Sequence, residues 1–283
     1  MLPGAASLFR KVRPYMLHLS LLAYTPVLLV VDGATAGVEP QVALGLLTFA
    51  VLWIATRRVT PDLRWAVWLC VPIATFFEVL GSLIWGGYTY ELHNIPLYVP
   101  PGHALVYAFG VTAAGLPVMR RHGPVVRRLV MVVATAWVVA GLTVLPWLTG
   151  RLDLQGAAVW PLLAWCVLRT GKGDMFAAIW VAVATLEIAG TWAGDWAWAS
   201  SPPWTHLASG NPPSAIAAGY AVIDGSVALL APMALAVAHR ARSTLLADRR
   251  IVVTTPSVRT PTAPSRAHAL AREGSTVSPA GAL

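Results

Sequence analysis

The chain has 283 residues, of which 57% are hydrophobic and only 11% are charged, whereas about a quarter of the residues of soluble domains are charged. This composition excludes a soluble globular protein and predicts an all-α, polytopic helical membrane protein. The net charge of +8 does not indicate nucleic-acid binding, because the basic residues, 18 Arg and 2 Lys, fall in short clusters between apolar runs. Such clusters are typical of topology signals.

Residues 1–14 contain no apolar core with a cleavage site, so we expect a cytoplasmic N-terminal segment and not a signal peptide. Eight apolar runs follow, and we expect each to form a transmembrane helix. The runs cover residues 15–36, 41–56, 65–86, 103–119, 129–148, 155–168, 175–194 and 214–238. The second and sixth runs are shorter than the roughly 20 residues that a span needs. The two cysteines, Cys70 and Cys166, lie in separate runs and predict packing residues, not a disulfide.

The positive charges predict how these helices are oriented. If the N-terminus lies in the cytoplasm, 19 of the 20 basic residues fall on the cytoplasmic side and only Arg151 lies outside. This asymmetry favours a multi-pass protein of the plasma (inner) membrane with both termini in the cytoplasm. Residues 240–283 are rich in Ser, Thr, Pro, Arg and Ala, which predicts a disordered, basic cytoplasmic tail.

A pattern in the third run recurs in the seventh. The first copy consists of Glu78, Gly81, Gly86, Tyr88, Tyr90, Pro100, Pro101 and Tyr107. The second consists of Glu187, Gly190, Gly194, Trp196, Trp198, Pro212, Pro213 and Tyr220. Because four spans separate the copies, we expect a parallel 4+4 internal repeat with halves at about 15–128 and 129–239.

Four polar residues in or beside the apolar runs are candidate catalytic groups: Glu78, Glu187, Asp224 and His103. A carboxyl group costs about 2.5–3.5 kcal/mol at the centre of a membrane and usually faces a protein interior or a wet cavity. Burial favours its neutral form, which can act as a general acid. His103, at the start of the fourth run, could relay protons. The alternative is structural: hydrogen bonds between helices for the acids, and a helix-end cap for the histidine.

Aromatic residues crowd the predicted outer ends of the helices. An interfacial belt explains most of them, but some could line a pocket for an apolar chain or stabilise a developing cation. The candidate substrate-binding residues are Trp85, Tyr88, Tyr90, Tyr98, Tyr107, Trp192, Trp196, Trp198 and Tyr220. We expect no metal or other cofactor, because the sequence contains no HExxH, GxSxG, P-loop or CxxC motif.

The string "EVLGSLIWGGYTYELHNIPLYVP" resembles the carotenoid-biosynthesis membrane family that includes bacterioruberin-pathway carotenoid hydratases. The resemblance covers about 25 of 283 residues and is carried by Glu78, Gly81, Gly86, Tyr88, Tyr90, Leu92, Pro96, Leu97 and Pro100. The chain departs from the family where a Thr-Gly and a Phe-Gly are replaced by "LIW" and "GG", and where a Trp is replaced within "PGHALVY". The resemblance implies an apolar polyene substrate and addition of water to a terminal double bond.

The residues are compatible with such a reaction. Glu78 could protonate the alkene, aromatic faces could stabilise the cation, and a water held by His103 or Glu187 could capture it. Two other classes stay open: a proton-coupled transporter whose paired acids bind protons or a cationic group, and a lipid-binding or structural envelope protein whose aromatic loops meet a partner. For the hydratase-like enzyme, the expected ligand is a membrane lipid or isoprenoid. No pattern in the sequence predicts an oligomeric state.

Overall fold

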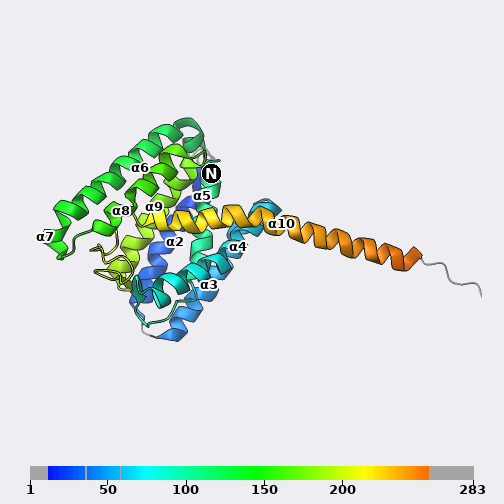
Figure 1. Cartoon of the computed structure of the whole chain (residues 1–283), viewed down its shortest axis with the longest axis horizontal. Helices are drawn as coiled ribbons and strands as arrows, with labels where there is room; N and C mark the ends of the chain where they lie inside the picture. Colours follow the sequence, from blue (N-terminus) through cyan, green and yellow to red (C-terminus); the bar gives the residue numbers. More distant parts are fainter. Residues whose placement is uncertain (1–11, 36, 58, 255–283) are drawn as a thin grey trace, which may run out of the picture. The chain divides into compact units, whose positions relative to one another are not determined.

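The computed structural model describes residues 12–35, 37–57 and 59–254, with side chains in the last helix up to Val237 and at Arg240. The described chain is all-α apart from one small sheet (Figure 1). Its elements are the 3-10 helix Arg13–Tyr15, α2 Met16–Gly33, α3 Val38–Thr56, α4 Pro61–Glu78, the π-helical turn Val79–Ile84, β1 Tyr88–Tyr90, α5 Val99–Ala113, α6 Pro117–Thr143, α7 Leu145–Thr149, α8 Leu154–Arg169, α9 Gly173–Ala193, β2 Trp196–Trp198 and α10 Ala217–Thr254.

The chain is a multi-pass helical membrane protein. Among the described residues, six helical segments are long and apolar enough to cross a bilayer: Arg13–Gly33, Val38–Thr56, Pro61–Ile84, Pro117–Thr143, Gly173–Ala193 and Ala217–Val237. All eight predicted apolar runs coincide with helices, but the fourth and sixth, α5 and α8, have only 15 and 16 residues. At 1.5 Å per residue such helices are about 22–24 Å long, short of the ~30 Å hydrocarbon core.

The short helix α5 lies in the interior of the helix bundle. Twelve of its 15 residues are buried, and it packs against α3, α4 and α9. A helix that is apolar on every side belongs inside a bundle and not at a lipid surface. Close approach to α9 depends on Gly110, where any side chain would collide with Ile179. The sequence did not reveal this difference, because an interior helix and a lipid-facing helix are both apolar.

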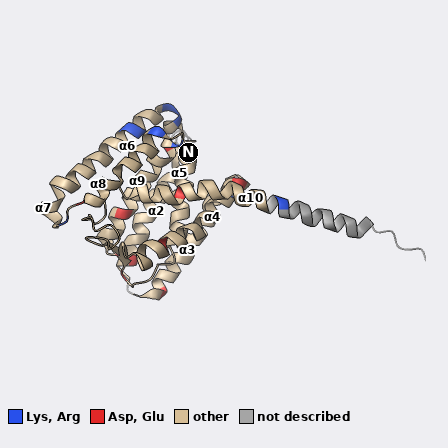
Figure 2. Cartoon of the chain, in the orientation of Figure 1, with Lys and Arg blue, Asp and Glu red and all other residues tan. Residues whose placement is uncertain are grey.

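Large apolar side chains on the outer helices face away from the core. Examples are Leu46 and Ile54 on α3 and Leu129 and Val132 on α6, all more than half exposed. Basic residues, blue in Figure 2, gather in the first part of α6. Clustering of this kind is the pattern on which the predicted orientation rests, and the orientation itself stays a prediction.

Met1–Val237 forms one compact unit and Ala238–Leu283 a second one. Both predicted halves, except the last two residues of the second, lie within the first unit, where α9 packs against α2 as well as α5. The predicted tail differs from the structure at its start, because α10 continues to Thr254. The stretch after residue 238 is rich in Ala, Arg and Leu, which favour helix. Residues 1–11 and 255–283, which carry the remaining predictions for the two termini, lie outside the described residues.

Candidate functional site

A two-stranded antiparallel sheet joins the loop after α4 to the loop after α9. In β1 and β2, Tyr88 lies opposite Trp198, and Tyr90 opposite Trp196. Successive side chains of a strand point to opposite faces, so the aromatic-x-aromatic spacing places all four rings on one face. The middle residues of both strands are exposed. The spacing is part of the pattern repeated in the sequence, but strands were not predicted from it.

The aromatic face of β1 holds the carboxyl group of Glu78. This residue ends α4 and is 5% exposed. Its Oε2 accepts hydrogen bonds from the hydroxyl groups of Tyr88 and Tyr90, both at 2.7 Å. Its Oε1 lies 2.7 Å from Nε2 of His103, in the second turn of α5. A π-helical turn follows Glu78 directly, a feature that occurs frequently at functional sites.

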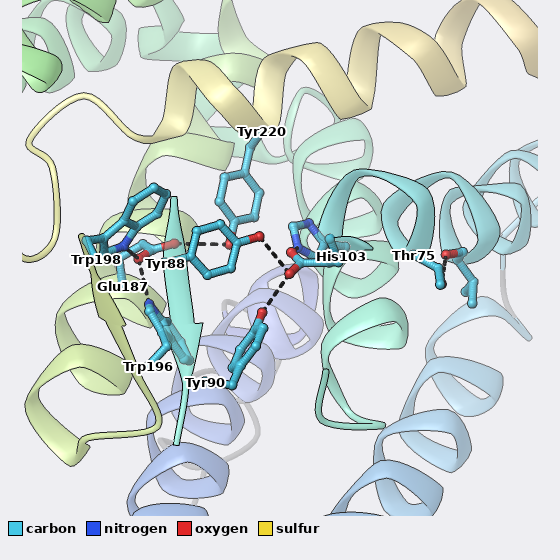
Figure 3. A network of polar contacts seen from close by, with 10 residues as sticks. Thr75, Tyr88, Tyr90, His103, Glu187, Trp196, Trp198 and Tyr220 are labelled. Atoms are coloured by element: carbon cyan, nitrogen blue, oxygen red, sulfur yellow. Dashed lines mark hydrogen bonds and ion pairs between the residues drawn. The ribbon is translucent and has the colours of Figure 1, made fainter. Parts of the chain in front are cut away.

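The aromatic face of β2 holds the second carboxyl group, that of Glu187 in the last turns of α9 (Figure 3). Its Oε2 accepts hydrogen bonds from the indole Nε1 of Trp196 at 3.1 Å and of Trp198 at 3.0 Å. The Tyr220 hydroxyl donates to Oε1 at 3.3 Å. Gly190 makes room for this arrangement, because a side chain there would collide with the Trp196 ring.

The two carboxyl groups lie on the wall of one cavity of about 210 Å³. His103 and Tyr220 also line it, with their rings stacked 4.6 Å apart. The remaining wall is mostly apolar, with aliphatic side chains from α2, α5, α9, α10 and the turn before α10: Leu28, Leu29, Leu105, Val106, Leu186, Ile216 and Ile223. The site therefore combines an apolar chamber with two buried acids and one histidine.

The tyrosines of β1 are hydrogen-bond donors over the whole physiological pH range. Burial raises the pKa of Tyr88 and of Tyr90 well above the usual value, and the negative charge of Glu78 raises both further. Glu78 thus has three donors, one of which is an imidazole, whereas the donors of Glu187 are two indoles and a phenol. Among the residues that line the cavity, His103 is the one histidine, and it contacts Glu78 and not Glu187.

Nine of the thirteen predicted site residues line the cavity: Glu78, Glu187, His103, Tyr88, Tyr90, Tyr98, Trp196, Trp198 and Tyr220. The other four lie elsewhere. Asp224 and Tyr107 are buried on α10 and α5 outside the cavity wall. Trp85 is 43% exposed and stacks obliquely on Trp204, and Trp192 is 77% exposed.

Sequence reasoning missed the part of the wall that α2 and α3 supply. Tyr24 and Thr48 line the cavity and share a hydrogen bond of 2.8 Å between their hydroxyl oxygens. Both lie in otherwise ordinary apolar runs, and nothing in their spacing distinguishes them from packing residues. They add a further pair of hydrogen-bonded hydroxyl groups to the cavity wall, and neither residue belongs to the repeated motifs.

In the part of the chain that the structure describes, no group of three or more His, Cys, Asp or Glu side chains is placed to hold a metal ion. Comparison with protein-family models, curated proteins and solved structures gave no match.

Proposed function

We propose that the chain binds the unsaturated end of an apolar, isoprenoid-type lipid and adds water across its terminal double bond. One observation carries this proposal: an apolar cavity has the Glu78–His103 pair and the Glu187 carboxyl group on its wall. Carotenoid hydratase-like chemistry, which the resemblance of the Glu78 segment implies, is of this kind.

The size and lining of the cavity support an apolar ligand that enters by one end. Ligand sites commonly measure about 300–1,000 Å³, and about 210 Å³ suits the end of a long chain better than a whole polyene. The aliphatic side chains Leu28, Val106 and Ile223 offer such an end only dispersion and hydrophobic contacts. A polar substrate would leave its hydrogen bonds unmade against this wall.

The Glu78–His103 pair supplies the proton. With one proton between them, the pair gives it to the less substituted alkene carbon, and a tertiary carbocation forms at the other carbon. General acids contribute about 10²–10⁴-fold to the rate of such steps. The two tyrosines that donate to Glu78 hold its carboxyl group in a fixed orientation, which is what proton transfer to a positioned carbon requires.

The Glu187 side of the cavity completes the reaction. The ring faces of nearby aromatic residues and the carboxylate of Glu187 stabilise the cation by electrostatic attraction. A water molecule then forms the new C–O bond and gives its extra proton to Glu187. Return of that proton to the Glu78–His103 pair restores the starting state. Tyr220 contacts both sides, because its hydroxyl group donates to Glu187 and its ring stacks on His103.

We further propose that the chain contains a parallel internal repeat and that both termini face the cytoplasm. Each acid lies in the C-terminal part of a helix, contacts two side chains of the strand that follows, and contacts one side chain of the helix after that strand. Antiparallel pairing of β1 with β2 is compatible with a two-fold axis through the sheet. His103, near the start of α5, contacts Glu78, and Tyr220, near the start of α10, contacts Glu187. We therefore pair His103 with Tyr220 in the proposed repeat, in place of the Tyr107–Tyr220 pairing suggested by the sequence.

Proton-coupled transport is the second candidate, and one observation favours it. Asp224 lies one turn beyond Tyr220 on α10, and Tyr107 one turn beyond His103 on α5; both are buried. These residues extend the polar groups of the site away from the sheet, as a proton path would. Proteoliposomes that dissipate a proton gradient, with Glu78→Gln and Glu187→Gln both defective, would support this candidate over the hydratase.

The hydratase proposal is tested with an acyclic polyene such as lycopene. Wild-type protein in proteoliposomes should yield a product that gains one oxygen from H₂¹⁸O. Glu78→Gln should lower turnover at least about 100-fold, whereas the matched control Glu39→Gln, an exposed acid at the start of α3, should leave it unchanged. His103→Gln should lower turnover and change its pH profile. Undiminished turnover of the Glu78→Gln variant would exclude the assigned acid.

A further inference from the structure

A second group of buried carboxylates lies where α2 and α9 end. At Gly33 any side chain would lie 2.5 Å from the carbonyl oxygen of Ala193, so the two backbones touch. Asp32 precedes Gly33 and is 1% exposed, and Asp195 follows shortly after Ala193 and is 0% exposed. The backbone of Asp195 is held on both sides, by its own N–H bond to Gly190 and by the N–H of Glu91.

Several oxygens in this group have no hydrogen-bond partner. Both carboxylate oxygens of Asp195 and Oδ1 of Asp32 are buried and unpaired, as is the amide oxygen of Asn94. The other oxygen of Asp32 accepts hydrogen bonds from Tyr98 at 2.6 Å and from Gln41 at 3.3 Å. Gln41 in turn accepts from Asn94 at 3.0 Å, which ties Asn94 to the same network.

No ion pair between described residues balances the negative charges of Asp32 and Asp195. Among the described residues, the ion pairs are His103–Glu78 and Arg127–Asp174, and neither involves Asp32 or Asp195. Burial, the charge of Asp32 and the charge of Glu91 raise the pKa of Asp195 to about 8. Tyr98 is the common neighbour, because burial, its hydrogen bond to Asp32 and the charge of Asp195 all raise its pKa. The C-terminal ends of α2 and α9 add the negative poles of two helix dipoles.

We propose that Asp32 and Asp195, with the amide oxygen of Asn94, bind a hard divalent cation of the calcium type. Two carboxylates balance a charge of +2, and carboxylate and amide oxygens are the ligands that Ca²⁺ prefers in proteins. The unpaired oxygens supply ligands without breaking an existing hydrogen bond. Such a site could not be recognised from His or Cys spacing, because its ligands are oxygens from distant segments.

The location of this site gives the cation a structural consequence. Asp195 immediately precedes β2, and Glu91, which donates its backbone N–H to Asp195, immediately follows β1. Tyr98 lines the lipid-binding cavity and also donates to Asp32. A bound cation would therefore hold the end of the sheet to the end of α2, next to the cavity and outside the Glu78–Glu187 hydrogen bonds.

The test measures cation binding without any substrate, so it is independent of the hydratase proposal. Full-length protein in detergent is treated with EDTA, and its thermal unfolding is followed as CaCl₂, MgCl₂ or KCl of equal ionic strength is added. We expect CaCl₂ to raise the midpoint by at least about 3 °C in a saturable way. Mg²⁺, which demands a tighter octahedral site, should have less effect, and KCl should have none.

Asp195→Asn and Asp32→Asn should each abolish the calcium shift, and Asn94→Ala should weaken calcium affinity about 10-fold. The control Glu39→Gln removes an equal charge from the exposed start of α3 and should keep the full shift. If an aspartate variant does not fold, the proposal is tested by the calcium affinity of Asn94→Ala and by direct binding of ⁴⁵Ca²⁺ to the wild type. The proposal is overturned by a wild type without a saturable shift, by equal shifts in KCl, or by aspartate variants that keep the shift.

Discussion

Tyr88 and Trp198 face each other across the two-stranded sheet, with ring centroids 4.7 Å apart, yet their polar atoms bind different acids. The hydroxyl group of Tyr88 donates to Glu78, and the indole of Trp198 donates to Glu187. The sheet is thus the element that fixes the two carboxyl groups relative to each other. Changes that displace one aromatic side chain should therefore disturb both acids.

Gly190→Ala should destabilise the protein, because the new methyl group would collide with the buried ring of Trp196. Overpacking of this kind costs about 1–3 kcal/mol, which corresponds to a lower thermal midpoint in detergent. Gly225→Ala is the matched control: it also lies in an apolar helix, but nothing lies within 4 Å of the added carbon. The control should be neutral or slightly stabilising, since alanine favours helix. Equal midpoints for the two variants would contradict the packing of Trp196.

Trp198→Phe should lower stability by about 1–3 kcal/mol, because it removes a buried donor from Glu187 and leaves that acid with one indole. Trp192→Phe, six residues earlier, changes a side chain that is 77% exposed and should alter stability by no more than about 0.5 kcal/mol. Thermal unfolding of both variants in the same detergent gives the comparison. A larger loss of stability for Trp192→Phe than for Trp198→Phe would contradict the assignment of Trp198 as the stabilising donor to Glu187.

The helices were predictable from the sequence, but their roles were not. Each apolar run became a helix, yet the composition of α5 did not distinguish an interior helix from a span, because burial in protein and burial in lipid select the same residues. The acids and aromatic residues of the cavity were found through the matched Glu78 and Glu187 motifs. Tyr24 and Thr48, which α2 and α3 contribute, had no signal, because only tertiary packing brings them to the wall.

The buried aspartates were missed for a different reason. Asp32 and Asp195 lie at the ends of apolar runs, where an acid is normally a solvated boundary residue. Their burial depends on the contact of Gly33 with Ala193, which joins two helices far apart in the sequence. Long-range backbone contacts of this kind leave no local pattern.

The stability of the fold should decrease at alkaline pH because of the tyrosines of the sheet, Tyr88 and Tyr90. Burial and Glu78 raise the pKa of Tyr88 and Tyr90 in the folded protein above the value of about 10 in the unfolded chain. The unfolded state therefore loses these protons first, so stability is full below about pH 10 and falls as the pH rises further. Tyr90→Phe should make this fall less steep. Absorbance at 295 nm at pH 10–11 measures the effect, and full ionisation of both tyrosines before unfolding would contradict it.

The register of the sheet can be tested by a cross-strand disulfide. Thr89 lies directly opposite Ala197, and both side chains are exposed on the face away from the acids. Directly opposed residues have Cα atoms about 4.5–5.5 Å apart, within the range of a disulfide. Thr89→Cys with Ala197→Cys should therefore oxidise within one chain, while the buried Cys70 and Cys166 stay free.

The matched control moves one partner by two residues, to Thr89→Cys with Ala199→Cys. This pair is diagonal, with a separation of about 7–8 Å, and should cross-link much more slowly. Peptide mapping by mass spectrometry identifies the linked pair, and Tyr88 and Trp198 keep their contacts with the two acids because the disulfide lies on the opposite face. Faster oxidation of the diagonal pair would show a different register and would separate the aromatic side chains from the carboxyl groups that they now hold.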